Sequence, residues 1–122
     1  MKNAGVVLYV DDEPINLKLF NIMFRNIFKI ITAQSGSEAL ELLQSNPEVN
    51  VVVSDMKMPG MNGLEFIETA RIQRGEIPFF LLSGYGMTPE IEKALNDQLI
   101  DGYFQKPLKK SLVEQELIKH MN

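Results

Sequence analysis

Five polar side chains stand where short apolar runs of the sequence give way to turn residues. Three are carboxylates, one is a hydroxyl and one is an ammonium group: Asp11, Asp12, Asp55, Ser83 and Lys106. Carboxylate oxygens are the ligands that hard cations such as Mg²⁺ prefer, and a carboxylate can also act as a nucleophile. A lysine brings a compact positive charge to such a group. This chemistry requires a fold that brings the five residues together.

The segment that ends on Asp55 gives the clearest structural signal. Val51 to Asp55 is short and rich in β-branched residues, which is typical of a buried strand. Pro59, Gly60 and Gly63 follow at once and predict a turn. A carboxylate at the C-terminal end of a buried parallel strand lies where open α/β sheets bind ligands. Taken alone, Asp55 could equally cap the turn that follows.

Short apolar runs alternate with helical patterns along the whole chain. The expected strands cover residues 6–10, 28–33, 51–55, 78–82 and 102–105. Between and after them, apolar stripes at helical spacing run from Leu17 to Ile27, Ala39 to Leu43, Leu64 to Ala70, Ile91 to Leu99 and Leu112 to Met121. Ser35 and Thr88 are expected to start two of the helices. This alternation predicts an α/β fold: a doubly wound five-stranded parallel sheet, flavodoxin-like (βα)5, with helices on both faces.

A strand order of 2-1-3-4-5 would make the first and third strands neighbours at the switch point of the sheet. Asp11, Asp12 and Asp55 would then form one cluster, and their repulsion would raise at least one pKa unless cations compensate. Lys106 is one such cation, and Mg²⁺, with Mn²⁺ as an alternative, is the other. No histidine is available at this edge, which argues against zinc.

The composition indicates a single globular domain over residues 1–122, with 45% hydrophobic and 23% charged residues. The chain has no cysteine, which excludes disulfides, thiol catalysis and Cys-based metal sites. A net charge of −4 without a basic run argues against direct nucleic-acid binding. No segment could span a membrane and no signal sequence opens the chain, so we expect a cytoplasmic protein.

The motifs at the strand ends, taken together and in order, resemble the receiver domain of two-component response regulators. The resemblance rests on Asp11-Asp12, Asp55-x-x-Met58-Pro59-x-x-x-Gly63, Ser83 and Lys106-Pro107, and it covers essentially the whole chain. There are two departures, Ser83 where threonine is common in the family and Gly84 where alanine is common. Serine keeps the hydroxyl, and glycine leaves more room beside it.

The resemblance implies that Asp55 accepts a phosphoryl group from a phosphohistidine of a sensor histidine kinase or phosphotransfer protein. Asp12 would bind Mg²⁺ directly and Asp11 through water. Asp55 and the backbone carbonyl of Lys57 would complete the protein ligands. Such a domain catalyses its own phosphorylation and dephosphorylation and has no external substrate to turn over.

The resemblance also implies roles after strand four and on strand five. Ser83 and Lys106 would each hold a phosphoryl oxygen, and the bond before Pro107 would be cis. The phosphoryl group would draw the Ser83 hydroxyl inward, and Tyr103 would pack into the space that opens; otherwise Tyr103 is only a half-buried strand residue. The surface that changes would comprise the helix after Thr88, the strand 102–105 and the last helix. This surface would signal to an effector domain or protein, or form a homodimer.

Lys57 and Tyr85 sit two residues beyond Asp55 and Ser83, at positions that in receivers flank the path of attacking water. A cation and a bulky ring there would alter the lifetime of the phosphoryl group in either direction. Three further residues are interpreted as solvated surface groups, namely His120, Arg71 and Arg74.

Three other functions fit parts of the pattern. An aspartyl-nucleophile phosphatase usually has a second Asp two residues after its nucleophile, where this chain has Lys57. A flavodoxin-type FMN carrier shares the sheet order, but the acidic cluster would repel the flavin phosphate. A pseudo-receiver that only binds and never carries phosphate usually lacks one or more of the residues above.

Overall fold

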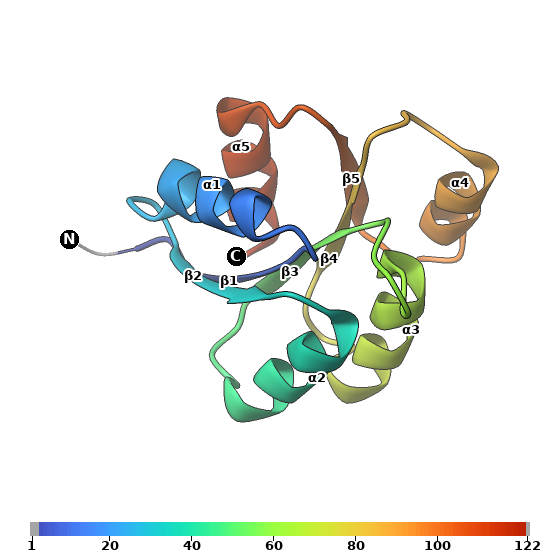
Figure 1. Cartoon of the computed structure of the whole chain (residues 1–122), viewed down its shortest axis with the longest axis horizontal. Helices are drawn as coiled ribbons and strands as arrows, with labels where there is room; N and C mark the ends of the chain where they lie inside the picture. Colours follow the sequence, from blue (N-terminus) through green and yellow to red (C-terminus); the bar gives the residue numbers. More distant parts are fainter. Residues whose placement is uncertain (1–2, 122) are drawn as a thin grey trace.

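The computed structural model describes residues 3–121 of the chain. Within these residues, five parallel strands form one sheet in the order β2-β1-β3-β4-β5, and a helix follows each strand (Figure 1). The strands are β1 (Val6–Val10), β2 (Lys29–Ala33), β3 (Val51–Asp55), β4 (Phe79–Ser83) and β5 (Gly102–Gln105). The helices are α1 (Pro14–Phe24), α2 (Gly36–Ser45), α3 (Gly63–Gln73), α4 (Pro89–Asn96) and α5 (Lys110–His120). The predicted fold class and strand order are confirmed.

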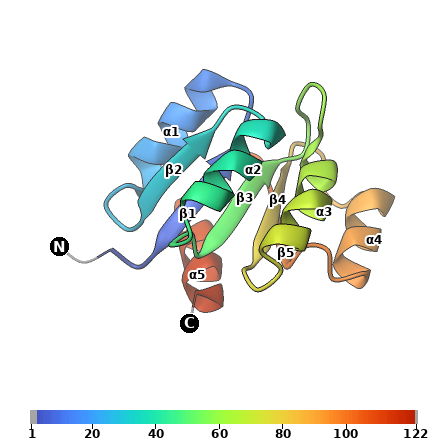
Figure 2. The ribbon, with the colours of Figure 1, turned by 90° about the horizontal axis from the view of Figure 1, so that it is seen from below.

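The helices cover both faces of the sheet. Figures 1 and 2 show α1 and α5 on one face and α2 and α3 on the other, with α4 beside α3 near the β5 edge. Each face has its own apolar core. Phe20 and Phe24 of α1 and Leu117 of α5 belong to one core, and Phe66 of α3 and Ile91 of α4 belong to the other. The three central strands, β1, β3 and β4, are buried on both faces, as expected for a parallel sheet covered by helices.

Side-chain caps start α2, α3 and α4 at the C-terminal edge of the sheet. The N–H of Glu38 donates to the Ser35 hydroxyl oxygen at the start of α2, and the N–H of Ile91 donates to Thr88 at the start of α4. Both predicted starts are confirmed. At α3, Asn62 and Glu65 form a reciprocal capping box. The caps of α3 and α4 close the loops that follow Asp55 and Ser83, whereas, within residues 3–121, α1 and α5 begin without a side-chain cap.

Several predicted boundaries and one predicted core residue are wrong. The strands β2 and β4 begin one residue later than predicted, at Lys29 and Phe79. Ile27 and Leu99 lie beyond the ends of their helices; α4 ends because Gln98 adopts a left-handed conformation, with a φ of 59°. Leu112 is 52% exposed because α5 turns its other face, with Val113 and Leu117, toward the sheet.

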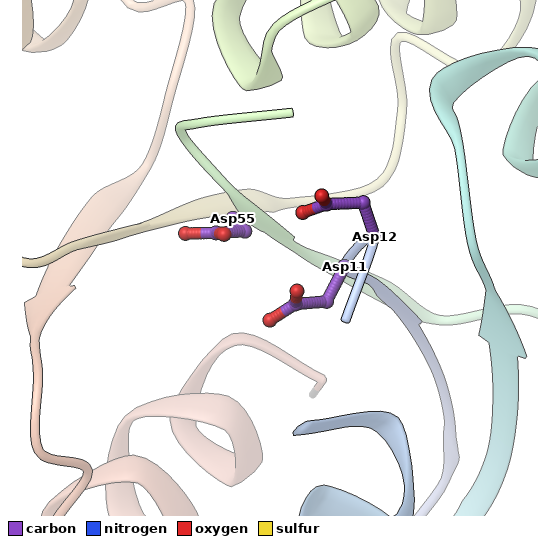
Figure 3. Close-up of side chains that lie close together, drawn as sticks. All are labelled: Asp11, Asp12 and Asp55. Carbon is purple, nitrogen blue, oxygen red and sulfur yellow. The ribbon is translucent and has the colours of Figure 1, made fainter. Parts of the chain in front are cut away.

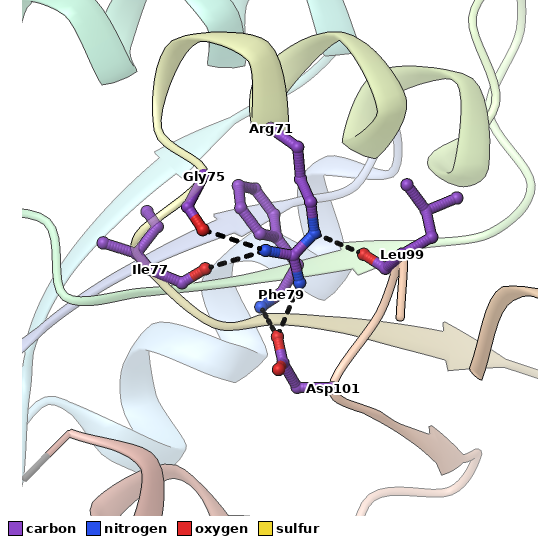
Figure 4. A network of polar contacts seen from close by, with 6 residues as sticks. All are labelled: Arg71, Gly75, Ile77, Phe79, Leu99 and Asp101. Atoms are coloured by element: carbon purple, nitrogen blue, oxygen red, sulfur yellow. Dashed lines mark hydrogen bonds and ion pairs between the residues drawn. The ribbon is translucent and has the colours of Figure 1, made fainter. Parts of the chain in front are cut away.

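Arg71 is not the solvated residue that the sequence suggested (Figure 4). Its guanidinium group donates to the carbonyl of Leu99 over 2.7 Å and forms an ion pair of 2.7 Å with Asp101. It also lies over the ring of Phe79, 4.8 Å from the centroid. The Asp101 carboxylate in turn accepts the N–H of Phe79. Arg71 therefore joins the end of α3 to the start of β4 and to the α4–β5 connection.

Arg74 and His120 are likewise more buried than expected. The side chain of Arg74 is 17% exposed, forms an ion pair with Glu76 and donates to the carbonyl of Val49. The ring of His120 meets Phe80 edge-on, with 5.0 Å between centroids. Both positions are near element ends, where sequence periodicity does not show which neighbour a long side chain will reach.

The helices are short, with eight residues in α4 and eleven in α1, α3 and α5. A membrane-spanning helix needs about 20 apolar residues. Between residues 3 and 121, no helix has the length and apolar character to cross a bilayer.

Candidate functional site

Three carboxylates meet at the C-terminal edge of the sheet (Figure 3). The strands β1 and β3 are neighbours, with Val10 paired to Ser54, so Asp11 and Asp55 follow side by side. One carboxylate oxygen of each of Asp11, Asp12 and Asp55 lies within 4.8 Å of the others. The sheet order brings these residues together as the sequence predicted.

Asp11 is fully buried, at 0% exposure, and both of its oxygens accept hydrogen bonds. The Tyr9 hydroxyl donates to Oδ2 over 2.7 Å, and the N–H of Glu13 donates to Oδ1 over 3.0 Å. Burial, followed by the hydrogen bond to Asp11, raises the pKa of Tyr9 far above its usual range, so the phenol keeps its proton. Sequence reasoning missed Tyr9. The signal was its spacing of two from Asp11, which places both side chains on one face of the strand.

Asp55 is 6% exposed, and Nζ of Lys106 lies 3.1 Å from its Oδ1. Burial raises the pKa of the Asp55 carboxyl; the Lys106 hydrogen bond opposes this and the Asp11 charge adds to it. Lys106 is held by its backbone N–H, which donates to the Ser83 carbonyl over 2.8 Å. The Lys106–Pro107 bond is cis, as the resemblance implied.

Ser83 ends β4, which lies between β3, the strand that ends on Asp55, and β5, the strand that Lys106 follows. Asp55 pairs with Leu82 and Ser83 pairs with Gln105, so the three strand ends stand in a row. Ser83 is 4% exposed, and its hydroxyl oxygen accepts the N–H of Tyr85 over 3.1 Å. Asp55, Ser83 and Lys106 line one cavity of about 330 Å³. A Cβ atom added at Gly84, in the same wall, would meet no atom within 4 Å.

Lys57 and Tyr85 form a pair at the mouth of this cavity. Nζ of Lys57 donates to the Tyr85 hydroxyl over 3.1 Å and lies 4.3 Å from the centre of its ring. The hydrogen bond to the Lys57 ammonium lowers the pKa of Tyr85 below its usual value. The sequence indicated that both residues flank the site, but it did not predict their contact with each other.

A second hollow, of about 580 Å³, adjoins the acidic cluster. Asp12, which is half-buried, lines it together with Lys57, Ser83 and Tyr85. The clustered donors are all oxygen atoms, which is the donor set that Mg²⁺ and Mn²⁺ accept. The edge of the sheet therefore combines a buried carboxylate, a cation beside it and room for a divalent ion.

Tyr103 lies on β5, outside this cavity. It is half-buried, pairs with Leu81 in the sheet and packs against the core on the α2–α4 face. This position is compatible with both roles considered from the sequence, that of a residue that packs inward on phosphorylation and that of a half-buried strand residue.

Comparisons with known proteins agree with this architecture. The sequence model of the response regulator receiver domain matches residues 7–118. The hydrogenase transcriptional regulatory protein HoxA of Cupriavidus necator is 35% identical over 84% of this chain, which spans only 21% of HoxA. The two-component response regulator ORR5 of Oryza sativa subsp. japonica is 32% identical over 92% of this chain and 85% of its own length. The structure of response regulator protein TrrA from Thermotoga maritima, in complex with Mg(2+)-BeF, matches with a TM-score of 0.82 at 28% identity, covering 94% of this chain and 97% of TrrA.

Proposed function

The chain belongs to the response regulator receiver domain family, and on this premise we propose that it is a signalling switch that accepts a phosphoryl group on Asp55. One observation carries the proposal. Asp55 is nearly buried, lies 3.1 Å from the Lys106 ammonium, and shares a cavity of about 330 Å³ with Lys106 and the Ser83 hydroxyl. These are the groups that an aspartyl phosphate would need around it.

In the proposed reaction, a carboxylate oxygen of Asp55 attacks the phosphorus atom of a phosphohistidine on the partner protein. The new P–O bond forms as the P–N bond breaks, and the imidazole nitrogen keeps the electron pair and takes a proton from solvent. The transferring group spreads negative charge over its oxygens. Lys106 is placed to offset that charge, and the Ser83 hydroxyl, which donates to no partner within residues 3–121, has its proton available for a phosphoryl oxygen.

The residues of the acidic cluster fit Mg²⁺, with Mn²⁺ as an alternative. Asp12 would hold the cation directly, Asp11 through water, and Asp55 and the Lys57 carbonyl would complete the set. The bound ion supplies positive charge that neutralises the carboxylates and the phosphoryl oxygens. The structure of TrrA in complex with Mg(2+)-BeF supports this part of the proposal.

The proposed donor is a sensor histidine kinase or a phosphotransfer protein. Phosphorylation would draw Ser83 toward Asp55 and let Tyr103 pack inward, and so change the surface of α4, β5 and α5. That surface would signal to an effector domain or protein, or pair with a second copy. We take residues 1–122 as one receiver domain acting in the cytoplasm.

Two other functions are less well supported. A phosphatase with an aspartyl nucleophile would need an acid or base two residues after Asp55, and the residue there is Lys57, which is bonded to Tyr85. A binding-only domain would not require Asp55, Ser83 and Lys106 to line the same cavity.

Intact mass spectrometry after incubation with acetyl phosphate tests the proposal. We expect one phosphoryl adduct that requires Mg²⁺ and is absent from Asp55→Asn. If no adduct forms at any time, amide spectra with beryllofluoride separate the two explanations. Shifted signals would indicate an adduct that is lost faster than it forms, whereas unchanged signals would contradict the proposal and favour a binding-only domain.

A further inference from the structure

Tyr9 holds a fixed position beneath the acidic cluster. It lies on β1 at 2% exposure, and its ring stacks on that of Phe20 with 4.0 Å between centroids and 3° between planes. This contact fixes the ring plane, and the hydroxyl is directed at Asp11, two residues further along the chain. The phenol therefore has one orientation and one polar partner.

Asp11 depends on the Tyr9 phenol more than Asp12 and Asp55 do. Asp55 has the Lys106 ammonium 3.1 Å away, and Asp12 is half-buried beside the larger hollow. Asp11 is fully buried, and in the part of the chain that the structure describes Tyr9 is the one side chain that donates to it. The other donor is the backbone N–H of Glu13. A buried carboxylate oxygen that accepts no hydrogen bond destabilises the folded protein. Loss of the Tyr9 hydroxyl would therefore change the orientation of the Asp11 carboxylate.

We propose that Tyr9 is a positioning residue for the metal site, in which its hydroxyl orients the Asp11 carboxylate for ligation of the divalent cation. The inference rests on the proposed function, because it requires that the acidic cluster bind Mg²⁺. The Tyr9 and Glu13 donors occupy one lone pair on each oxygen of Asp11 and leave the others for the cation or its water. Partners that orient a metal ligand in this way typically change metal affinity by about 10- to 100-fold when removed.

The variant Tyr9→Phe tests this directly, since it keeps the stacked ring and removes only the hydroxyl. Mg²⁺ is titrated into both proteins while backbone amide shifts are recorded. We expect Tyr9→Phe to bind Mg²⁺ about tenfold more weakly than the original chain. The matched control is Phe24→Leu, which removes a fully buried ring of the same core and leaves the Tyr9 and Phe20 pair unsubstituted; it should lose thermal stability and keep most of the Mg²⁺ affinity.

The outcomes separate this inference from the proposed function. Equal or tighter Mg²⁺ binding by Tyr9→Phe overturns the inference alone, as does an equal loss of affinity in Phe24→Leu, which would indicate a merely structural role. Absence of Mg²⁺ binding by the original chain overturns the metal site itself and the inference with it.

A measurement on the unsubstituted protein covers the case in which Tyr9→Phe does not fold. With ¹³C-labelled tyrosine, the Cζ signal of Tyr9 should shift with Mg²⁺ and saturate together with the amide signals. Tyr103, outside the cavity, serves as the internal reference. A Tyr9 signal that stays unchanged while the amides shift would contradict the proposed role.

Discussion

Nζ of Lys106 lies 3.1 Å from Oδ1 of Asp55, although β4 separates β3, which ends on Asp55, from β5, which Lys106 follows. Across residues 3–121, this is the one ion pair made by a carboxylate of the acidic cluster. The backbone N–H of Lys106 donates to the carbonyl of Ser83, and the Lys106 side chain then passes the end of β4 to reach Asp55. The contact therefore links the ends of β3, β4 and β5 at the Asp55 carboxylate.

Loss of this cation should impair phosphorylation. We expect Lys106→Met to form the acetyl phosphate adduct about 100-fold more slowly, because a preorganised group that offsets transition-state charge typically contributes 10²- to 10³-fold. The initial rate of adduct formation, followed by intact mass, measures the effect. Lys109→Met, at an exposed site three residues on, is the control and should react at the original rate. Equal rates in the two variants would contradict the role of Lys106.

The buried Asp55 carboxyl should make the unmodified domain less stable when it is ionised. Because burial raises the pKa of Asp55, the native state takes up this proton more readily than the unfolded state does. Stability from this group is therefore present at low pH and is lost as the pH rises through the raised pKa. In EDTA at pH 7, Asp55→Asn should have the higher free energy of unfolding by urea denaturation.

The same comparison at low pH provides the control for Asp55. Below about pH 3.9, the ordinary Asp pKa, the carboxyl is protonated in both states, so the advantage of Asp55→Asn should shrink. An advantage that does not change with pH, or a variant that is less stable at pH 7, would contradict the assignment.

The pair of Lys57 and Tyr85 should protect an aspartyl phosphate from water. Hydrolysis requires water to attack the phosphorus atom and expel the Asp55 carboxylate, and these side chains line the mouth of the cavity. We expect Tyr85→Ala to lose the phosphoryl group several-fold faster, measured as decay of the adduct mass. Tyr85→Phe keeps the ring beneath the Lys57 ammonium and should stay close to the original rate. Unchanged or slower decay in Tyr85→Ala would rule out the shielding role.

Arg71 should contribute to the free energy of unfolding and not to phosphorylation. Its side chain is 20% exposed, and its guanidinium group binds Asp101 and the Leu99 carbonyl, so Arg71→Met should lower the free energy of unfolding by about 2 kcal/mol. The exposed pair of Lys93 and Asp97 offers the matched comparison, and Lys93→Ala should change stability little. Similar urea midpoints for both variants would show that the Arg71 contacts contribute no more than a surface ion pair.

The fold and the acidic cluster could be predicted from the sequence because one pattern determines both. Alternation of strands and helices leaves few topologies, and the sheet order then places Asp11 next to Asp55. The Lys106 contact followed from the same edge, since the ends of parallel strands lie together.

Side-chain contacts away from this edge of the sheet were not predictable in this way. Arg71 reaches Asp101 because of where α3 ends relative to the α4–β5 connection, and periodicity does not contain that information. The same holds for Leu112, whose exposure depends on how α5 is rotated against the sheet. The bond from Tyr9 to Asp11 is local, and strand alternation alone could have suggested it.

The most direct test of the account is to locate the phosphoryl group on the chain. Borohydride reduction of the phosphorylated protein converts an aspartyl phosphate into homoserine, and peptide mass spectrometry then identifies the converted residue. The proposal that Asp55 accepts the phosphoryl group predicts conversion at Asp55, dependent on Mg²⁺, with Asp11 and Asp12 unchanged. Conversion at Asp11 or Asp12, or a phosphoryl adduct that yields no homoserine, would contradict it.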